Sequence, residues 1–182
     1  MNELERTAFH ADFSRALAFA TELHARQVRK QTDIPYISHL ISVAGLVLEH
    51  GGNRDEAIAA LLHDSIEDCS EDFPGGVHAL RARIRAEFSP EVLEIVEGCT
   101  DSETVPKPPW QERKERYLEH PATASPSLRL ASSRDKLHNA RAIVAEGIGL
   151  PAAVAHARAA AGRILVANAG GPAWAKAPQE LR

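Results

Sequence analysis

Apolar residues recur along most of this chain at intervals of three and four positions, which is the spacing of one face of an α-helix. This spacing predicts a helix that is capped by Asp12 and runs to about residue 30. A second helix should start with the segment 35–39 and end at Gly51 and Gly52. No stretch alternates apolar and polar residues as a half-buried strand does. The pattern therefore predicts an all-α fold.

Three further helices are expected in the middle of the chain. Asn53 is a suitable N-cap for a helix that reaches residue 62 and is apolar on most sides, so we place this helix at the centre of a bundle. Apolar positions between residues 77 and 88 predict the next helix. The sequence Ser89-Pro90-Glu91 marks the start of another, which continues to Gly98.

The last third of the chain contains a proline-rich segment and a change in composition. Prolines at 106–109 predict a loop, followed by a polar helix over 110–120 and a long helix over 127–146. From residue 147 onward alanine supplies about a third of the residues, which favours a helix over 151–168. No repeat or linker divides the chain, so we expect one domain over residues 1–170 and a loosely ordered tail over 171–182.

Composition and charge narrow the class of protein. The chain has 182 residues, of which 44% are hydrophobic and 25% charged, as in globular domains. No apolar run approaches the roughly 20 residues that span a bilayer, the N-terminus lacks the apolar core of a secretory signal, and two cysteines do not suggest a disulfide framework. Acidic residues outnumber basic ones by 25 to 21, without a dense basic stripe. We therefore expect a cytoplasmic protein with no nucleic-acid or membrane partner.

Six consecutive residues at the end of the central helix, 63–68 (HDSIED), gather four groups that can bind a metal or move a proton. Residues three and four apart on a helix are neighbours, so we expect His63 beside Glu67 and Asp64 beside Asp68. Burying several carboxylates after an apolar segment is costly without compensation, so a cation or a water-filled site is expected here. A lone His-Asp pair is more often structural, but the full cluster favours a metal.

Two distant segments could complete a metal site. His39 lies near the start of the second expected helix, and Asp135 shares a face of the long helix with Asn139. Two imidazoles with two carboxylates suit Mn²⁺, Fe²⁺ or Zn²⁺ better than Ca²⁺. Each residue also has a simpler interpretation, because His39 could cap its helix and Asp135 could pair with Lys136 or Arg141.

Taken in order, the segments Arg29-Lys30, PYISH (35–39), HDSIED (63–68) and DKLHN (135–139) resemble the HD-domain metal phosphohydrolases. The resemblance is to the RelA/SpoT-type (p)ppGpp hydrolase domain, whose small alarmone hydrolase members have about this length, and it covers roughly residues 16 to 146. It implies an all-α HD-domain helical bundle that holds one Mn²⁺, with Fe²⁺ or Zn²⁺ as alternatives. The implied reaction removes the 3′-pyrophosphate of guanosine tetra- or pentaphosphate and gives GDP or GTP and pyrophosphate.

The same resemblance implies roles for individual residues. The metal ligands would be His39, His63, Asp64 and Asp135. The acidic pair that orients and deprotonates the attacking water would be Glu67 and Asp68. The nucleotide would be held by Arg29, Lys30 and Asn139.

The chemistry of phosphate-ester hydrolysis agrees with these roles. It needs an activated nucleophile and cations around the charge that develops in the transition state. Glu67 has the spacing expected of a carboxylate base beside a metal. Arg113 and Lys114, in the polar helix, are a second candidate pair of cations, although a solvated helix face explains them equally well.

Departures from the family pattern leave the substrate open. Arg134 stands before Asp135 where the family has alanine, and Ala142 replaces a small polar residue. The sequence after Gly147 does not match the aromatic-containing C-terminal helices that the family usually carries. A phosphatase acting on NADPH or another nucleotide, and a non-catalytic HD module that binds nucleotide or metal, are therefore the alternatives. The oligomeric state, including a homo-oligomer, also stays open.

Three further residues near these segments are expected to be structural. His24 lies on the inner face of its helix and is expected to pack there, and Cys69 is expected to be a small buried residue. His138 is expected to face away from Asp135 and Asn139.

Overall fold

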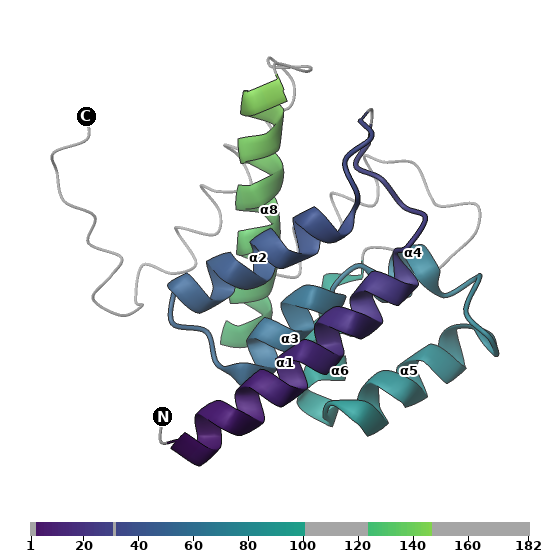
Figure 1. The fold of residues 1–182 in the computed structure, drawn as a ribbon, viewed down its shortest axis with the longest axis vertical. Coiled ribbons are helices and arrows are strands. Elements are labelled where there is room, and N and C mark those ends of the chain that lie inside the picture. Colours follow the sequence, from purple (N-terminus) through teal and green to yellow (C-terminus); the bar gives the residue numbers. More distant parts are fainter. Residues whose placement is uncertain (1–2, 31, 101–123, 147–182) are drawn as a thin grey trace, which may run out of the picture.

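The structure is a computed structural model that describes residues 3–30, 32–100 and 124–146. Its helices are α1 (Glu3–Leu23), α2 (Ile37–Glu49), α3 (Arg54–Leu62), α4 (Ser65–Cys69), α5 (Gly76–Glu87), α6 (Pro90–Cys99) and α8 (Pro126–Glu146) (Figure 1). The only β-structure within these residues is an isolated bridge between Val28 and Pro35. The predicted all-α bundle is thus confirmed. The helices expected at 110–120 and 151–168, and the domain limit at residue 170, lie outside the described residues.

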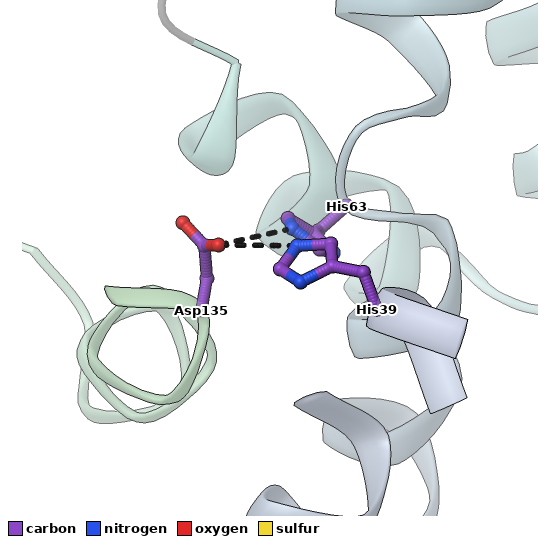
Figure 2. A group of neighbouring side chains, drawn as sticks. All are labelled: His39, His63 and Asp135. Carbon is purple, nitrogen blue, oxygen red and sulfur yellow. Dashed lines mark ion pairs between the residues drawn. The ribbon is translucent and has the colours of Figure 1, made fainter. Parts of the chain in front are cut away.

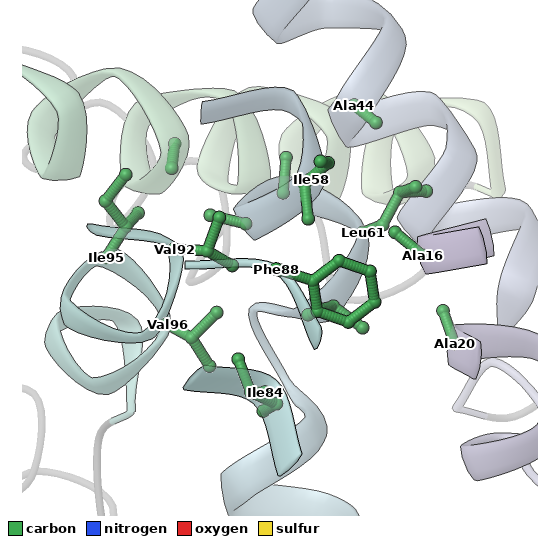
Figure 3. Close-up of a cluster of buried hydrophobic side chains, with 14 of the residues drawn as sticks. Ala16, Ala20, Ala44, Ile58, Leu61, Ile84, Phe88, Val92, Ile95 and Val96 are labelled. Carbon is green, nitrogen blue, oxygen red and sulfur yellow. The ribbon is translucent and has the colours of Figure 1, made fainter. Parts of the chain in front are cut away.

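Helix α3 lies at the centre of the bundle, as its apolar character on most sides predicts. Residues 57–62 have no exposed surface, and α3 packs against α1, α2, α6 and α8. Figure 3 shows Ile58 and Leu61 of α3 among the facing side chains of the surrounding helices. A helix without a polar face is stable only when neighbours cover it on all sides.

Two predicted helix starts have the expected caps. The Asn53 side chain accepts a hydrogen bond from the backbone N–H of Glu56 at 3.0 Å, and the Glu56 carboxylate accepts one from the backbone N–H of Asn53 at 2.7 Å, which completes a capping box for α3. At α6, the Ser89 hydroxyl accepts from the backbone N–H of Val92 at 3.0 Å, and Pro90 is the first helical residue.

The central helix ends at Leu62, and residues 63–68 do not continue it as the position of the motif at its end implied: a turn at His63 and Asp64 separates it from the short helix α4. His63 Nδ1 lies 2.9 Å from the carbonyl oxygen of Ala60, and the Ser65 hydroxyl donates to the carbonyl of Leu62 at 2.6 Å. Side-chain donors that take backbone carbonyls in this way compete with the continued helix. Because of this break, Glu67 and Asp68 lie on a separate helix, α4, that follows His63 and Asp64 directly.

The first helix begins before the predicted cap and ends sooner than predicted. Asp12 lies inside α1, where its carboxylate is 2.6 Å from the guanidinium of Arg15 and 2.6 Å from that of Arg54 on α3. Asp12 therefore joins two helices by ion pairs instead of starting one. After Leu23 the chain turns into a loop, so Arg29 lies on this loop and not on a helix.

Three segments that are far apart in the sequence are brought together by the packing of α2, α3 and α8. Helix α8 packs against α2, α3 and α6, and Figure 1 shows α2 crossing α8. Ala131 and Asp135 of α8 are buried in this contact. None of the described helices is long and apolar enough to cross a bilayer.

The central position of α3 predicts a large stability difference between two leucines. We expect Leu61→Ala to lower the free energy of unfolding by about 2–5 kcal/mol, because it removes a side chain with no exposed surface and leaves a cavity. The matched control is Leu48→Ala, since Leu48 on α2 is 38% exposed. Urea unfolding followed by circular dichroism measures both variants, and equal losses would contradict the central placement of α3.

Candidate metal centre

Three buried side chains from three different segments converge on one position. His39 comes from α2, His63 from the turn after α3, and Asp135 from α8. Their ligand atoms all lie within 4.8 Å of one another. The Oδ1 atom of Asp135 is 3.2 Å from His39 Nε2 and 3.7 Å from His63 Nε2, and Figure 2 shows both imidazoles facing this carboxylate. This arrangement is a buried His-His-Asp group suited to a metal ion.

Asp64 lies beside this group as the sequence motif predicts. Its Oδ2 atom is 3.0 Å from His63 Nε2 and 3.7 Å from His39 Nε2. The Tyr36 hydroxyl donates a hydrogen bond to the same oxygen at 2.6 Å. Tyr36 is thus a site residue that has no role among the sequence-based expectations. The signal that could have found it is its place in the segment 35–39.

The electrostatics of this group suit a cation. Although burial alone lowers the pKa of His63, the carboxylates of Asp64 and Asp135 outweigh it and raise that pKa well above its usual value. Burial raises the pKa of Asp135, but Lys136 and the two imidazoles hold it well below the usual range. The carboxylates that favour a proton on His63 also favour a divalent cation, for which neutral imidazole and ionised carboxylate are ligands.

A second observation supports the same fit. The buried Nε2 atom of His63 makes no hydrogen bond to any described residue, although Asp64 Oδ2 lies close to it. A buried polar nitrogen without a well-aligned partner is costly. A metal ion among the four side chains would remove this cost.

His63 and His39 each make a second contact through Nδ1, the ring nitrogen that does not face Asp135. The backbone carbonyl of Ala60 accepts from His63 at Nδ1, and Nδ1 of His39 lies 2.8 Å from Nδ1 of His138. The expectation that His138 faces away from Asp135 and Asn139 is therefore wrong, because its ring contacts His39 at the same centre. Residues three apart on a helix share one side, so α8 presents Asp135 and His138 to the same region.

The Asp135 carboxylate is fixed by two neighbours on its own helix. The Asn139 amide donates to Oδ1 at 2.5 Å, and Lys136 Nζ lies 2.6 Å from Oδ2. The Asn139 oxygen in turn accepts a hydrogen bond from the Arg29 guanidinium at 3.1 Å. Arg29 and Asn139, both predicted to bind substrate, therefore lie next to the metal centre. Lys30 follows on the same loop and is exposed.

The predicted acidic pair lies on α4, directly after Asp64. Glu67 is partly buried, whereas Asp68 is exposed and its Oδ2 accepts a hydrogen bond from the Gln27 amide at 2.8 Å. The backbone N–H of Asp68 donates to the carbonyl of Asp64 at 2.9 Å. Asp64 and Asp68 are therefore one helical turn apart, as expected, although the central helix ends before them. Arg113 and Lys114 lie outside the described residues.

His24 and Cys69 pack beside the centre, as expected. The His24 ring is buried and stacks on Tyr36, with 5.2 Å between ring centroids. Cys69 Sγ is 3.6 Å from His24 Nδ1, and burial raises the pKa of the Cys69 thiol to about 12. A thiol with so high a pKa is not an activated nucleophile.

Comparisons with known proteins point to one family. Residues 16–156 match the sequence model of the HD domain. The chain is 39% identical over 129 residues to guanosine-3′,5′-bis(diphosphate) 3′-pyrophosphohydrolase MESH1 of Xenopus tropicalis. The aligned region covers 69% of this chain and 66% of that protein. It is 34% identical over 134 residues to MESH1 of Mus musculus, covering 72% of this chain and 69% of the relative.

A solved structure shares the fold. It is described as a metazoan orthologue of SpoT that hydrolyses ppGpp, and it superposes on this chain with a TM-score of 0.72 at 27% sequence identity. The superposition covers 90% of this chain and 88% of that one.

The geometry predicts that Asp64→Ala abolishes metal retention. If Asp64 binds the metal directly, as its motif predicts, its loss should cost more than the roughly 10–100-fold in affinity that loss of an outer partner costs. The measurement is metal content by mass spectrometry after loading with Mn²⁺ and dialysis. The exposed Asp33 provides a control, since Asp33→Ala should retain as much metal as the wild type. Equal metal content in the two variants would contradict the role of Asp64.

Proposed function

Because this chain belongs to the HD-domain family, we propose that it is a metal-dependent phosphohydrolase that removes the 3′-pyrophosphate of guanosine tetra- and pentaphosphate. The products would be GDP or GTP and pyrophosphate. The observation that carries this proposal is the buried group of His39, His63 and Asp135, with Asp64 beside it and the acidic pair of α4 directly after it. The similarity to the MESH1 proteins supports the choice of substrate.

In this proposal four side chains hold the metal: His39, His63, Asp64 and Asp135. This mixed set of nitrogen and oxygen ligands suits Mn²⁺, with Fe²⁺ or Zn²⁺ as alternatives. A bound divalent cation lowers the pKa of water, which provides a nucleophile near neutral pH.

The acidic pair on α4 acts on the attacking water. Glu67 takes the proton as the water attacks phosphorus, and Asp68 helps to orient the water. The hydrogen bond from Gln27 restrains the Asp68 carboxylate, so part of this orientation comes from the loop after α1.

The nucleotide is held by groups on the loop and on α8. Arg29 and Asn139 already contact each other beside Asp135, and Lys30 lies next in the loop. Arginine pairs well with phosphate oxygens and balances the charge that builds up in the transition state. We also assign Arg113 and Lys114 to the substrate side, from the sequence alone.

We further propose a partner class, a cellular compartment and domain limits for this chain. The partner is a small nucleotide and not a nucleic acid, because the chain carries 25 acidic and 21 basic residues. Cys69 and Cys99 carry free thiols, which fits a location in the reducing cytoplasm. Residues 1–170 would form the HD phosphohydrolase domain, with residues 171–182 as its tail.

A comparison of substrates tests the proposal. The full chain, loaded with Mn²⁺, is incubated separately with guanosine tetraphosphate, NADPH and GMP, and the products are resolved by ion-exchange chromatography. We expect GDP and pyrophosphate from the tetraphosphate and no turnover of the other two. Orthophosphate from NADPH or GMP alone would indicate a different HD phosphatase. Binding of the tetraphosphate without turnover would indicate a non-catalytic module.

The role of Glu67 leads to a separate prediction. Glu67→Gln should keep the metal and lower kcat by roughly 100–10,000-fold, because it removes a proton acceptor and leaves the four metal ligands unchanged. Metal content and single-turnover rates are measured on the same preparation. Glu71→Gln, at an exposed position just after α4, is the control and should leave kcat unchanged. A Glu67→Gln variant as active as the wild type would refute the assignment of Glu67 as the base.

A further inference from the structure

The two histidines at the metal centre have their Nδ1 atoms held by different kinds of group. His63 Nδ1 faces the carbonyl oxygen of Ala60, which can only accept, so Nδ1 of His63 carries the proton. The lone pair of His63 then lies on Nε2, the atom closest to Asp64. The tautomer of His63 is thus set by the backbone of α3.

For His39, the group that faces Nδ1 is a side chain and not a backbone carbonyl. Its Nδ1 atom is 2.8 Å from Nδ1 of His138, and the two ring centroids are 4.8 Å apart with an angle of 49° between the rings. In a hydrogen bond between two ring nitrogens, one nitrogen must carry a proton and the other a lone pair. An imidazole can do either, so the direction of this bond depends on what the other nitrogen of His39 does.

The other nitrogen of His39 faces the metal centre. His39 Nε2 lies 3.2 Å from Asp135 Oδ1 and 3.7 Å from Asp64 Oδ2. As a ligand this atom must carry a lone pair, which places the proton of a neutral His39 ring on Nδ1. His138 Nδ1 must then accept, and the proton of the His138 ring must lie on Nε2.

We propose that His138 is a positioning residue for the metal centre: it accepts a hydrogen bond from His39 Nδ1–H and so directs the Nε2 lone pair of His39 at the metal. Metal-binding histidines commonly donate their second N–H to such an acceptor, which fixes the tautomer and the ring orientation. Helix α8 would thereby supply the ligand Asp135 and, one turn later, the group that orients a ligand on α2. The inference rests on the proposed function, since it assumes that His39 binds a metal.

The test compares the Mn²⁺ affinity of the full chain and its variants by isothermal titration calorimetry. His138→Phe keeps a ring but removes the acceptor, and we expect affinity to fall about 10–100-fold. His138→Asn offers an amide oxygen near the position of Nδ1 and should recover most of the lost affinity. His78→Phe, at an exposed position on α5, is the control and should bind Mn²⁺ like the wild type.

Two results would overturn the inference: wild-type affinity in His138→Phe, or an equal loss in His138→Phe and His138→Asn. A wild-type protein that binds no Mn²⁺ would refute the proposed function as well. A wild type that binds Mn²⁺ and hydrolyses the tetraphosphate, with His138→Phe unaffected, would refute the role of His138 alone.

A measurement on the unaltered protein covers the case in which the variants do not fold. Nitrogen-15 NMR of the Zn²⁺-loaded wild type reports which ring nitrogens carry protons, because Zn²⁺ is d¹⁰ and leaves the spectrum sharp. We expect a proton on Nδ1 of His39 and on Nε2 of His138. A proton on Nδ1 of His138 would show that the bond runs the other way and would overturn the proposal.

Discussion

The structure depends on the burial of two carboxylates against two imidazoles at the meeting point of α2, the turn after α3, and α8. Asp64 and Asp135 lose much of their contact with water here, which is unfavourable unless positive charge is close by. Because the four groups come from segments nearly 100 residues apart, this charge balance exists only when the three segments are packed together. The chemistry of the site and the tertiary fold therefore impose the same requirement on the chain.

Most of the fold could be predicted from the sequence because its helices follow simple local rules. The apolar character of residues 57–62 on all sides placed α3 at the centre, and Asn53 and Ser89 marked two helix starts. The errors occurred where side-chain contacts decide the local structure, and one of these contacts is with a distant residue. Asp12 looks like a cap in isolation, but Arg54 makes it an ion-pair residue inside α1. The helix break before α4 depends on side chains that take backbone carbonyls, which apolar spacing does not reveal.

At the site, the motif residues could be predicted from the sequence, whereas the residues that support them could not. The motif residues His39, His63, Asp64 and Asp135 could be named from their chemistry and order, and the structure brings them together. Their supporting partners could not be found in this way. A tyrosine, a glutamine or a histidine near a motif has many uses, and only the packing of neighbouring helices shows that Tyr36 contacts Asp64, that Gln27 contacts Asp68, and that His138 contacts His39.

Asp135 can face the metal centre and also pair with Lys136, because its carboxylate has two oxygens. Oδ2 lies against Lys136, which is the ordinary ion pair that the sequence allows. Oδ1 faces His39 and His63 and also accepts from Asn139, whose own oxygen contacts Arg29. A continuous path of polar contacts therefore runs from the metal centre through Asp135 and Asn139 to a cation on the loop. Since Asn139 bridges the Asp135 carboxylate and Arg29, a displacement of the Arg29 guanidinium would act on the same carboxylate that faces the metal centre.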